Sequence, residues 1–205
     1  MKINYNILMK DIIAGIKSGN APKILLHSCC GPCSTEVIAR LTPYFDITIL
    51  YYNPNIEPKA EYEKRKKEQI RLIKEFSSVN KLDFLDCDYE NEVFLEMAKG
   101  LETEPEGGTR CHRCYELRLN KTALLAKEKD YDYFGTTLTV SPYKNSVVIN
   151  QIGEKLSEIH QIKYLYSDFK KEDGYKKSIE YSKKYNLYRQ NYCGCHFSRV
   201  IGIEE

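Results

Sequence analysis

Seven of the eight cysteines in this chain of 205 residues fall into three short clusters that are far apart in sequence. The clusters are Cys29-Cys30-Gly31-Pro32-Cys33, Cys111-His112-Arg113-Cys114 and Cys193-Gly194-Cys195. Thiolates are ligands of zinc and of iron–sulfur clusters, and they are also the nucleophiles of thiol–disulfide exchange. We therefore expect a fold that brings the three clusters together into one thiolate site.

The number of thiols exceeds what one metal centre needs. One tetrahedral zinc or one iron–sulfur cluster takes four ligands, so the surplus could bind a second metal or cycle as a disulfide. Neighbouring side chains of an extended segment point in opposite directions, so Cys29 and Cys30 are expected to serve different partners. Cys193 and Cys195 would point to the same side. Cys87 stands alone and is expected to be a core residue.

Composition indicates one soluble domain. Hydrophobic residues make up 42% and charged residues 29% of the chain, and no apolar run reaches the roughly 20 residues of a membrane span. The N-terminus lacks a signal-peptide pattern, so we expect a cytoplasmic protein without membrane association. In a reducing compartment, clustered cysteines indicate metal or redox chemistry rather than a disulfide framework. The net charge of +2 argues against a uniformly basic nucleic-acid coat but allows a local basic face.

The alternation of short apolar runs with amphipathic stretches predicts an α/β fold, a parallel sheet with helices on both faces. The expected strands are residues 23–27, 47–52, 82–86, 133–138 and 164–166, and the expected helices are residues 5–18, 34–41, 59–76, 91–99, 111–127, 146–160 and 174–185. Sites in such folds form on the loops that leave the carboxyl ends of strands. The first cysteine cluster and residues 53–58 and 141–145 lie on such loops.

Basic and aromatic side chains near these loops are candidates for contact with RNA phosphates and bases. They include Lys59, Lys64, Arg65, Lys66, Lys67, Lys144, Lys170, Lys171, Arg189, Tyr52, Tyr62, Tyr143 and Tyr192. Interleaved glutamates make a solvated helix face an equally good interpretation of residues 59–67. After the first strand, where an ATP pyrophosphatase would carry its phosphate-binding loop, the chain has His-Ser-Cys-Cys-Gly-Pro-Cys. Thiols thus take the place of a phosphate cradle.

Taken in order, the motifs resemble those of the epoxyqueuosine reductase family called QueH, from about residue 24 to residue 198. They are Leu26-His27-Ser28-Cys29-Cys30-Gly31-Pro32-Cys33, Tyr51-Tyr52-Asn53-Pro54-Asn55-Ile56, Glu61-Tyr62-Glu63-Lys64-Arg65, Arg110-Cys111-x-x-Cys114, Thr136-Thr137-Leu138-x-x-Ser141-Pro142-x-Lys144-Asn145 and Tyr188-Arg189-Gln190-Asn191-Tyr192-Cys193-Gly194-Cys195. The resemblance implies a Rossmann-like fold, similar to adenine-nucleotide alpha-hydrolase (HUP-like) proteins. Residues 1–22 lie outside it and are expected to be a helical extension of one catalytic domain, residues 23–205.

The family resemblance implies the last step of queuosine biosynthesis, in which an epoxide at the tRNA wobble position loses its oxygen to give an alkene. It implies a [4Fe-4S] cluster and an adjacent mononuclear iron, and no cobalamin. The expected partners are a tRNA with a GUN anticodon and an external electron donor, a reduced flavodoxin- or ferredoxin-like protein. Electrons would pass from the cluster to the iron, which engages the epoxide oxygen as a Lewis acid.

Carried over to this chain, the resemblance gives the following site residues. All seven clustered cysteines are expected to bind metal, with Cys29, Cys30, Cys111, Cys114, Cys193 and Cys195 as cofactor ligands. The expected catalytic residues are Cys30, Cys33, Tyr143 and Lys144. Some family members carry Asp at the position of Cys33, and both side chains can bind iron. The expected RNA contacts are Tyr52, Asn53, Asn55, Tyr62, Arg65, Lys144 and Arg189.

Three other readings of the cysteine pattern stay open at this point. A tRNA-thiolating enzyme with a CxxC-bound cluster would need ATP, for which no phosphate loop is found. A zinc-stabilised RNA-binding module would contain zinc and no iron. A thiol–disulfide oxidoreductase would form a reversible Cys193–Cys195 or Cys111–Cys114 bond. Spacing alone also leaves open which cysteines hold the cluster and which hold the lone iron.

Overall fold

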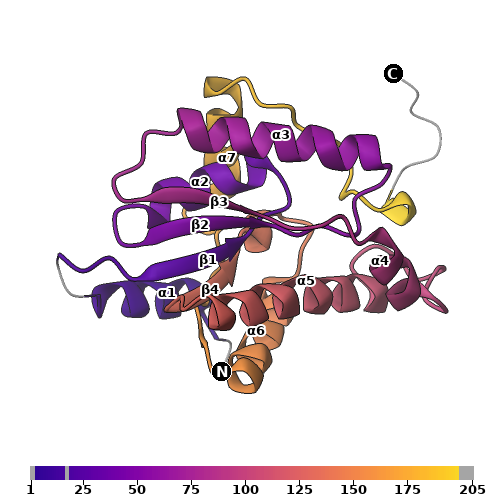
Figure 1. The fold of residues 1–205 in the computed structure, drawn as a ribbon, viewed down its shortest axis with the longest axis horizontal. Helices are drawn as coiled ribbons and strands as arrows, with labels where there is room; N and C mark the ends of the chain where they lie inside the picture. Colours follow the sequence, from indigo (N-terminus) through magenta and orange to yellow (C-terminus); the bar gives the residue numbers. More distant parts are fainter. Residues whose placement is uncertain (1–2, 17–18, 199–205) are drawn as a thin grey trace.

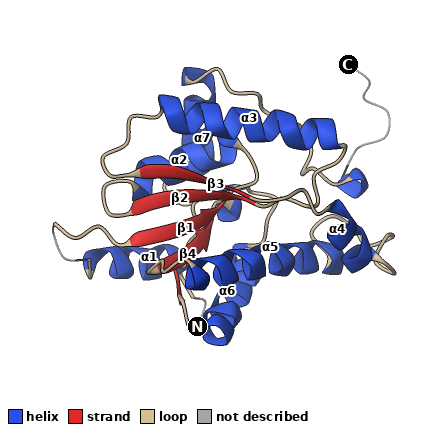
Figure 2. Ribbon diagram, in the orientation of Figure 1, coloured by secondary structure: helices blue, strands red, loops and turns tan. Residues whose placement is uncertain are grey.

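The computed structural model describes residues 3–16 and 19–198, which form a five-stranded parallel sheet covered by helices (Figures 1 and 2). The strand order is β3-β2-β1-β4-β5. The strands are β1 (Lys23–His27), β2 (Asp46–Tyr51), β3 (Leu82–Asp86), β4 (Tyr133–Thr136) and β5 (Lys163–Tyr164). The predicted α/β class with a parallel sheet is confirmed.

Each connection between strands carries a helix, as parallel pairing requires. The helices are α1 (Tyr5–Ala14), α2 (Gly31–Leu41), α3 (Lys59–Glu75), α4 (Asn91–Ala98), α5 (Thr109–Glu128), α6 (Ser146–His160) and α7 (Gly174–Lys184). Figure 1 shows α2, α3 and α7 on one face of the sheet and α5 with α6 on the other. Short 3₁₀ turns occur at Leu138–Val140 and His196–Ser198.

The central strand β1 divides the core into two parts by the period-two alternation of its side chains. Ile24 and Leu26 pack in one apolar cluster with Val37 of α2, whereas Leu25 packs in the other with Leu119 of α5 and Phe134 of β4. All three β1 residues are fully buried. A strand that is apolar on both faces is typical of a central parallel strand, which explains the continuous apolar run in the sequence.

The strand order reverses between β1 and β4, and this places the site. From β1 the chain proceeds outward through β2 and β3, then returns to add β4 and β5 on the other side. Helices before and after such a switch point lie on opposite faces, so a crevice opens at the carboxyl ends of the two strands. The loop with Cys29 and Cys30 leaves β1 here, and the loop of residues 137–145 leaves β4.

Several predicted boundaries differ from the structure. The fourth strand ends at Thr136 rather than at residue 138, because the Thr136 hydroxyl accepts a hydrogen bond from the Leu138 N–H and the chain turns into a 3₁₀ segment. The fifth strand has only two residues. The second helix begins at Gly31, three residues earlier than expected, with Pro32 in its first turn, where proline is well tolerated.

The first helix packs on the sheet through Met9, which belongs to the same apolar cluster as Ile24 and Phe169. Its first residue, Tyr5, stacks on Tyr166 with ring centroids 6.0 Å apart. The end predicted for this helix, Ser18, lies outside the described residues. The division at residue 22 into an extension and a catalytic domain stays a prediction. Among the described helices, none has the length and apolar character needed to cross a membrane.

A close contact between α6 and β5 predicts one stability effect. A Cβ atom at Gly153 of α6 would lie 2.3–2.5 Å from ring atoms of the buried Tyr164 of β5. We expect Gly153→Ala to lower the free energy of unfolding by about 1–3 kcal/mol, because overpacking outweighs the better helix propensity of alanine. Urea unfolding measures this. The control is Gly15→Ala, whose Cβ atom would come no closer than 3.4 Å to Ile12 O; equal destabilisation by both variants would contradict the assignment.

Candidate metal centre

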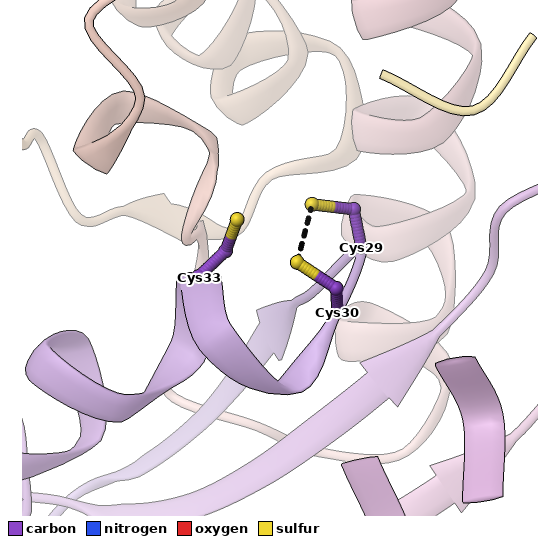
Figure 3. A group of neighbouring side chains, drawn as sticks. All are labelled: Cys29, Cys30 and Cys33. Atoms are coloured by element: carbon purple, nitrogen blue, oxygen red, sulfur yellow. Dashed lines mark hydrogen bonds between the residues drawn. The ribbon is translucent and has the colours of Figure 1, made fainter. Parts of the chain in front are cut away.

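The first thiol group consists of Cys29, Cys30 and Cys33, whose sulfur atoms all lie within 4.8 Å of one another (Figure 3). Cys29 and Cys30 belong to the loop after β1, and Cys33 lies in the first turn of α2. The Sγ atoms of Cys29 and Cys30 are 3.8 Å apart. This spacing suits three ligands of a single metal ion, and the three residues are buried or half-buried.

The expectation that Cys29 and Cys30 point in opposite directions is wrong. It assumed that the strand continues through both residues. The chain instead bends at Cys29, and Cys30 is the N-cap of α2. Entry into the helix therefore turns both thiols toward Cys33, and the three thiols face one point (Figure 3).

The second thiol group joins the other two clusters. Cys111 and Cys114 lie in the first turns of α5, and Cys193 and Cys195 lie in the segment after α7; all four line one cavity. Cys114 and Cys195 are buried and pack against Phe94 of α4. Residues about 80 positions apart thus share one cavity, as the sequence predicted.

The two thiol groups adjoin each other. Cys193 lines the cavity of the second group and also a larger cleft of about 420 Å³ that contains Cys29 and Cys33. The three predicted clusters therefore do meet, but as a group of three and a group of four thiols. The remaining cysteine, Cys87, lines a different hollow beside Asp86 and Lys121.

Arg65 of α3 holds the segment that carries the third cluster. Its side chain is fully buried, and its Nη1 donates a hydrogen bond to Cys193 O at 3.0 Å, with Nη2 3.4 Å from Tyr192 O. Glu61, one turn earlier, fixes the guanidinium through an ion pair of 2.7 Å. The guanidinium thus positions the backbone beside two cysteines.

Close packing at Gly194 also holds the segment that carries Cys193 and Cys195. The Gly194 carbonyl accepts a hydrogen bond from the Glu57 N–H at 2.9 Å. Gly194 has φ +138°, and a Cβ atom there would lie 2.9 Å from Ile56 Cγ1. Only glycine suits this backbone and this contact. The spacing of Cys193 and Cys195 therefore depends on the loop after β2.

Two arginines line the four-cysteine cavity; Arg110 donates to the backbone carbonyls of residues 101, 102 and 104, and Arg118 is the one with two unused Nη donors in the described chain. Arg118 lies one turn after Cys114 on α5, is 1% exposed, and its Nε donates to Cys114 O at 3.1 Å. Nη1 and Nη2 are buried and have no hydrogen-bond partner in the described part of the chain. Burial lowers the pKa of the guanidinium, but the negative charge that Cys114 and Cys193 can carry outweighs burial and raises it.

Such a buried cation with unused donors fits an anionic occupant. Leaving a buried charge unpaired costs several kcal/mol. A [4Fe-4S] cluster takes four cysteine thiolates and, with them, carries a net negative charge. The cavity offers four thiols and two arginines, Arg110 and Arg118, beside the carboxylate of Glu106, so its residues fit this group. The structure itself establishes a cysteine-rich site that can hold a metal or an iron–sulfur cluster.

The thiols differ in their protonation. Burial raises the pKa of Cys30 and of Cys114 to about 12, so both are neutral thiols at pH 7 in the metal-free chain. Hydrogen bonds from the Cys30 and Cys33 thiols hold the pKa of Cys29 well below its usual range. Metal ligation needs thiolates, so metal loading must release protons from this site.

Lys144 and Gln190 complete the wall around the first thiol group. Lys144, in the loop between β4 and α6, lines the large cleft with Cys29, Cys33 and Cys193. Burial lowers the pKa of this ammonium, but the neighbouring cysteines outweigh that effect and raise it. Gln190 donates a hydrogen bond from Nε2 to the Cys30 sulfur at 3.0 Å.

Of the seven residues that the resemblance gives as RNA contacts, Lys144 and Arg189 line the cleft, as do the further candidates Tyr143 and Tyr192. The other five are at most 2% exposed: Tyr52, Asn53, Asn55, Tyr62 and Arg65. RNA cannot reach these five side chains in this structure. They brace the site loops instead; for example, Asn53 Nδ2 donates to Ser28 O at 2.8 Å, directly before the first cluster. Tyr143, an expected catalytic residue, is 78% exposed at the rim of the cleft.

Sequence reasoning missed Arg118 and gave Gln190 no role. A signal for Arg118 exists, because it falls on the face of α5 that also carries the buried Tyr115, Leu119 and Thr122. An arginine on an apolar face, four residues after a CxxC cysteine, indicates a buried charge partner. No comparable pattern marks Gln190, whose contact with Cys30 depends on tertiary structure.

Comparison with known proteins gives concordant matches. A family model described as "Epoxyqueuosine reductase QueH" matches residues 24–200. The QueH epoxyqueuosine reductase of Staphylococcus epidermidis is 48% identical over 97% of this chain and 86% of its own length. That of Thermotoga maritima is 34% identical over 85% of this chain and 89% of its own. A solved structure, the U34-tRNA thiolase NcsA of Methanococcus maripaludis with its [4Fe-4S] cluster, shares the fold with a TM-score of 0.54 at 13% identity, covering 94% of this chain and 67% of that one.

Replacing Arg118 is expected to weaken metal retention without lowering the stability of the metal-free chain. Arg118→Met removes an unpaired buried charge, so the metal-free chain should unfold at equal or higher urea concentration. The same change should weaken metal retention roughly 10- to 100-fold, because the second shell of the site loses its cation. Metal content after dialysis against a chelator and urea unfolding measure the two effects.

The matched control is Arg113→Met, an arginine on the same helix whose side chain is 63% exposed. It should alter neither property. Metal retention that is the same in the Arg118→Met and Arg113→Met variants would contradict the role of Arg118.

Proposed function

The chain belongs to the QueH family of epoxyqueuosine reductases, and from that membership we propose that it converts epoxyqueuosine to queuosine at the wobble position of a tRNA. The overall reaction takes two electrons and two protons, breaks both carbon–oxygen bonds of the epoxide, and yields an alkene and water. The observation that carries this proposal is the arrangement of seven thiols, in groups of four and three, beside one cleft. A reductase of this kind needs redox-active metal next to a nucleoside-sized space.

We assign the two thiol groups to two metal centres. Cys111, Cys114, Cys193 and Cys195 would hold a [4Fe-4S] cluster, because four thiolates complete such a cluster and Arg118 balances its charge. Cys29, Cys30 and Cys33 would hold the adjacent iron. When bound, these groups would supply the electrons and a Lewis acid for the epoxide oxygen. No residue role in this scheme requires cobalamin.

The chain's own residues would bind and orient the nucleoside in the large cleft. Its volume of about 420 Å³ lies within the range of small-ligand sites. Lys144 reaches this cleft beside Cys29 and Cys33, so its ammonium can donate a hydrogen bond and a proton to the departing oxygen. Arg189, exposed at the rim, is available to an RNA phosphate.

The electrons would come from an external donor of the flavodoxin or ferredoxin type. Of the CxxC pair, Cys111 is half-buried whereas Cys114 is buried. Cys111 also accepts a hydrogen bond from the Gly107 N–H at 3.2 Å, in the exposed loop before α5. We propose that the electron donor approaches the cluster from the side of this loop.

A reduction assay with the anaerobically reconstituted protein tests the proposal. The substrate is an anticodon stem-loop RNA carrying epoxyqueuosine, with dithionite as electron source and neither ATP nor cobalamin present. We expect queuosine as the product, detected by mass spectrometry of the nucleosides. A requirement for ATP, with transfer of sulfur to the RNA, would favour the tRNA-thiolating enzyme and would reject the reductase. Stoichiometric zinc with no iron would favour the zinc-stabilised RNA-binding module and would also reject the reductase.

Substitutions at Cys33 test the three-thiol group. A carboxylate can also ligate iron, so Cys33→Asp should keep activity within about tenfold of the parent, whereas Cys33→Ala should lose roughly 100-fold or more. Cys87→Ser, at the one cysteine outside both groups, is the matched control and should keep full activity. Turnover by Cys33→Ala at the parental rate would reject the assignment of this thiol to the reaction.

A further inference from the structure

A second hollow, of about 660 Å³, lies beside the cleft that contains Cys29 and Cys33, here called the thiol cleft. Three segments form it, namely the start of α1, the loop between β4 and α6, and the turn that follows β5. Its lining includes Asn4, Tyr5, Tyr143, Lys144, Lys170 and Lys171. Tyr143 and Lys144 also line the thiol cleft, so these two side chains form the boundary between the two spaces.

The second hollow is basic. Lys144, Lys170 and Lys171 line it against one carboxylate, that of Asp168. Lys170 is 3.0 Å from this carboxylate, and its Nζ is 3.4 Å from Lys144 O, so it stabilises the wall. Lys171 is exposed, and no ion pair of its side chain is found within residues 3–16 and 19–198. Its charge therefore remains available to an anionic ligand.

Tyr143 presents an aromatic face at the boundary. With 78% of its surface exposed, it is the most exposed large apolar side chain in the described chain. Its backbone is fixed, because its N–H donates to the Ser141 hydroxyl at 3.4 Å and Asn145, two residues on, caps α6. An exposed ring on a positioned backbone, next to free positive charge, is the combination on which single-stranded nucleic acids stack.

We propose that this second hollow binds the nucleotide next to the modified one in the same RNA strand. Its base stacks on Tyr143, and a phosphate contacts Lys171. The inference rests on the proposed function and extends it. When the modified nucleoside enters the cleft with Cys29 and Cys33, it no longer stacks on the adjacent base, and the ring face of that base is exposed. Asn4 and Tyr5 also line this hollow, so in this proposal the start of the N-terminal helix borders the bound nucleotide.

Charge reversal at Lys171 tests the phosphate contact. We expect Lys171→Glu to raise the KM for the epoxyqueuosine stem-loop RNA by about tenfold more than the KM for the free epoxyqueuosine nucleoside. The slope of log affinity against log salt for the stem-loop should fall by about 0.7, the loss of one phosphate contact. The control is Lys74→Glu on the last turn of α3, the same charge change at an exposed lysine outside both hollows.

Two substitutions at Tyr143 test the stacking contact. Tyr143→Ala should weaken stem-loop binding by about tenfold, whereas Tyr143→Phe should bind like the parent, because the ring and not the hydroxyl makes the contact. Binding is measured with the metal-loaded protein, and iron content is measured for each variant to show that the thiol site is intact.

The outcomes separate this inference from the proposed function. Stem-loop binding with parental affinity and salt dependence by both Lys171→Glu and Tyr143→Ala would overturn the second hollow as an RNA site. A parent protein that binds the stem-loop but never reduces it would instead overturn the proposed function. Equal losses for the stem-loop and the free nucleoside would also overturn the inference, because they would place both residues in the nucleoside site itself.

Discussion

The structure depends on the balance between a cluster of buried thiols and the cations placed among them. Four cysteines line a cavity that contains the guanidinium of Arg118, and neither Nη atom of that group has a partner in the described chain. A buried unpaired charge is among the most costly features a fold can keep. The cavity is therefore complete only when it holds negative charge, and this requirement links the packing of α5 to the chemistry of the site.

The topology of the sheet explains how three distant segments reach this place. The switch point between β1 and β4 brings the first cluster and Lys144 to one edge. Cys193 lines both this cleft and the cavity with Cys111 and Cys114, which lie at the start of α5. The third cluster comes from no strand end. Arg65 and the loop after β2 hold it instead, through hydrogen bonds to the carbonyls of Cys193 and Gly194. The position of the third cluster thus depends on side chains that are not themselves candidate metal ligands.

Much of the architecture could be predicted from the sequence. Strands β1 and β3 and helix α6 have the predicted bounds, because long apolar or amphipathic patterns are local. The place of the first cysteine cluster followed from the general rule that sites lie at the carboxyl ends of parallel strands, and the convergence of all three was expected from their short spacings. The family resemblance supplied the reaction, which no periodicity or spacing could indicate.

The misses have tertiary causes. The direction of the Cys29 and Cys30 thiols depends on where α2 begins, and that boundary was placed three residues too late. Arg65 carries a charge on a polar helix and was expected to face RNA, yet it is buried because it anchors a segment more than 120 residues away. Arg118 was missed because its role depends on the cysteines around it, and these come from two distant segments of the chain. Buried charges that support loops are the part of this site that local sequence does not reveal.

Iron and acid-labile sulfide per chain, measured after anaerobic reconstitution of two variants, test the division of the thiols most directly. The parent should hold about five irons and four sulfides. Replacing Cys29, Cys30 and Cys33 together with alanine should leave about four irons and four sulfides, whereas replacing Cys111 and Cys114 with alanine should remove the sulfide and leave at most about one iron. If both variants lost iron and sulfide in the same proportion, the seven thiols would form one undivided centre and the account would be wrong.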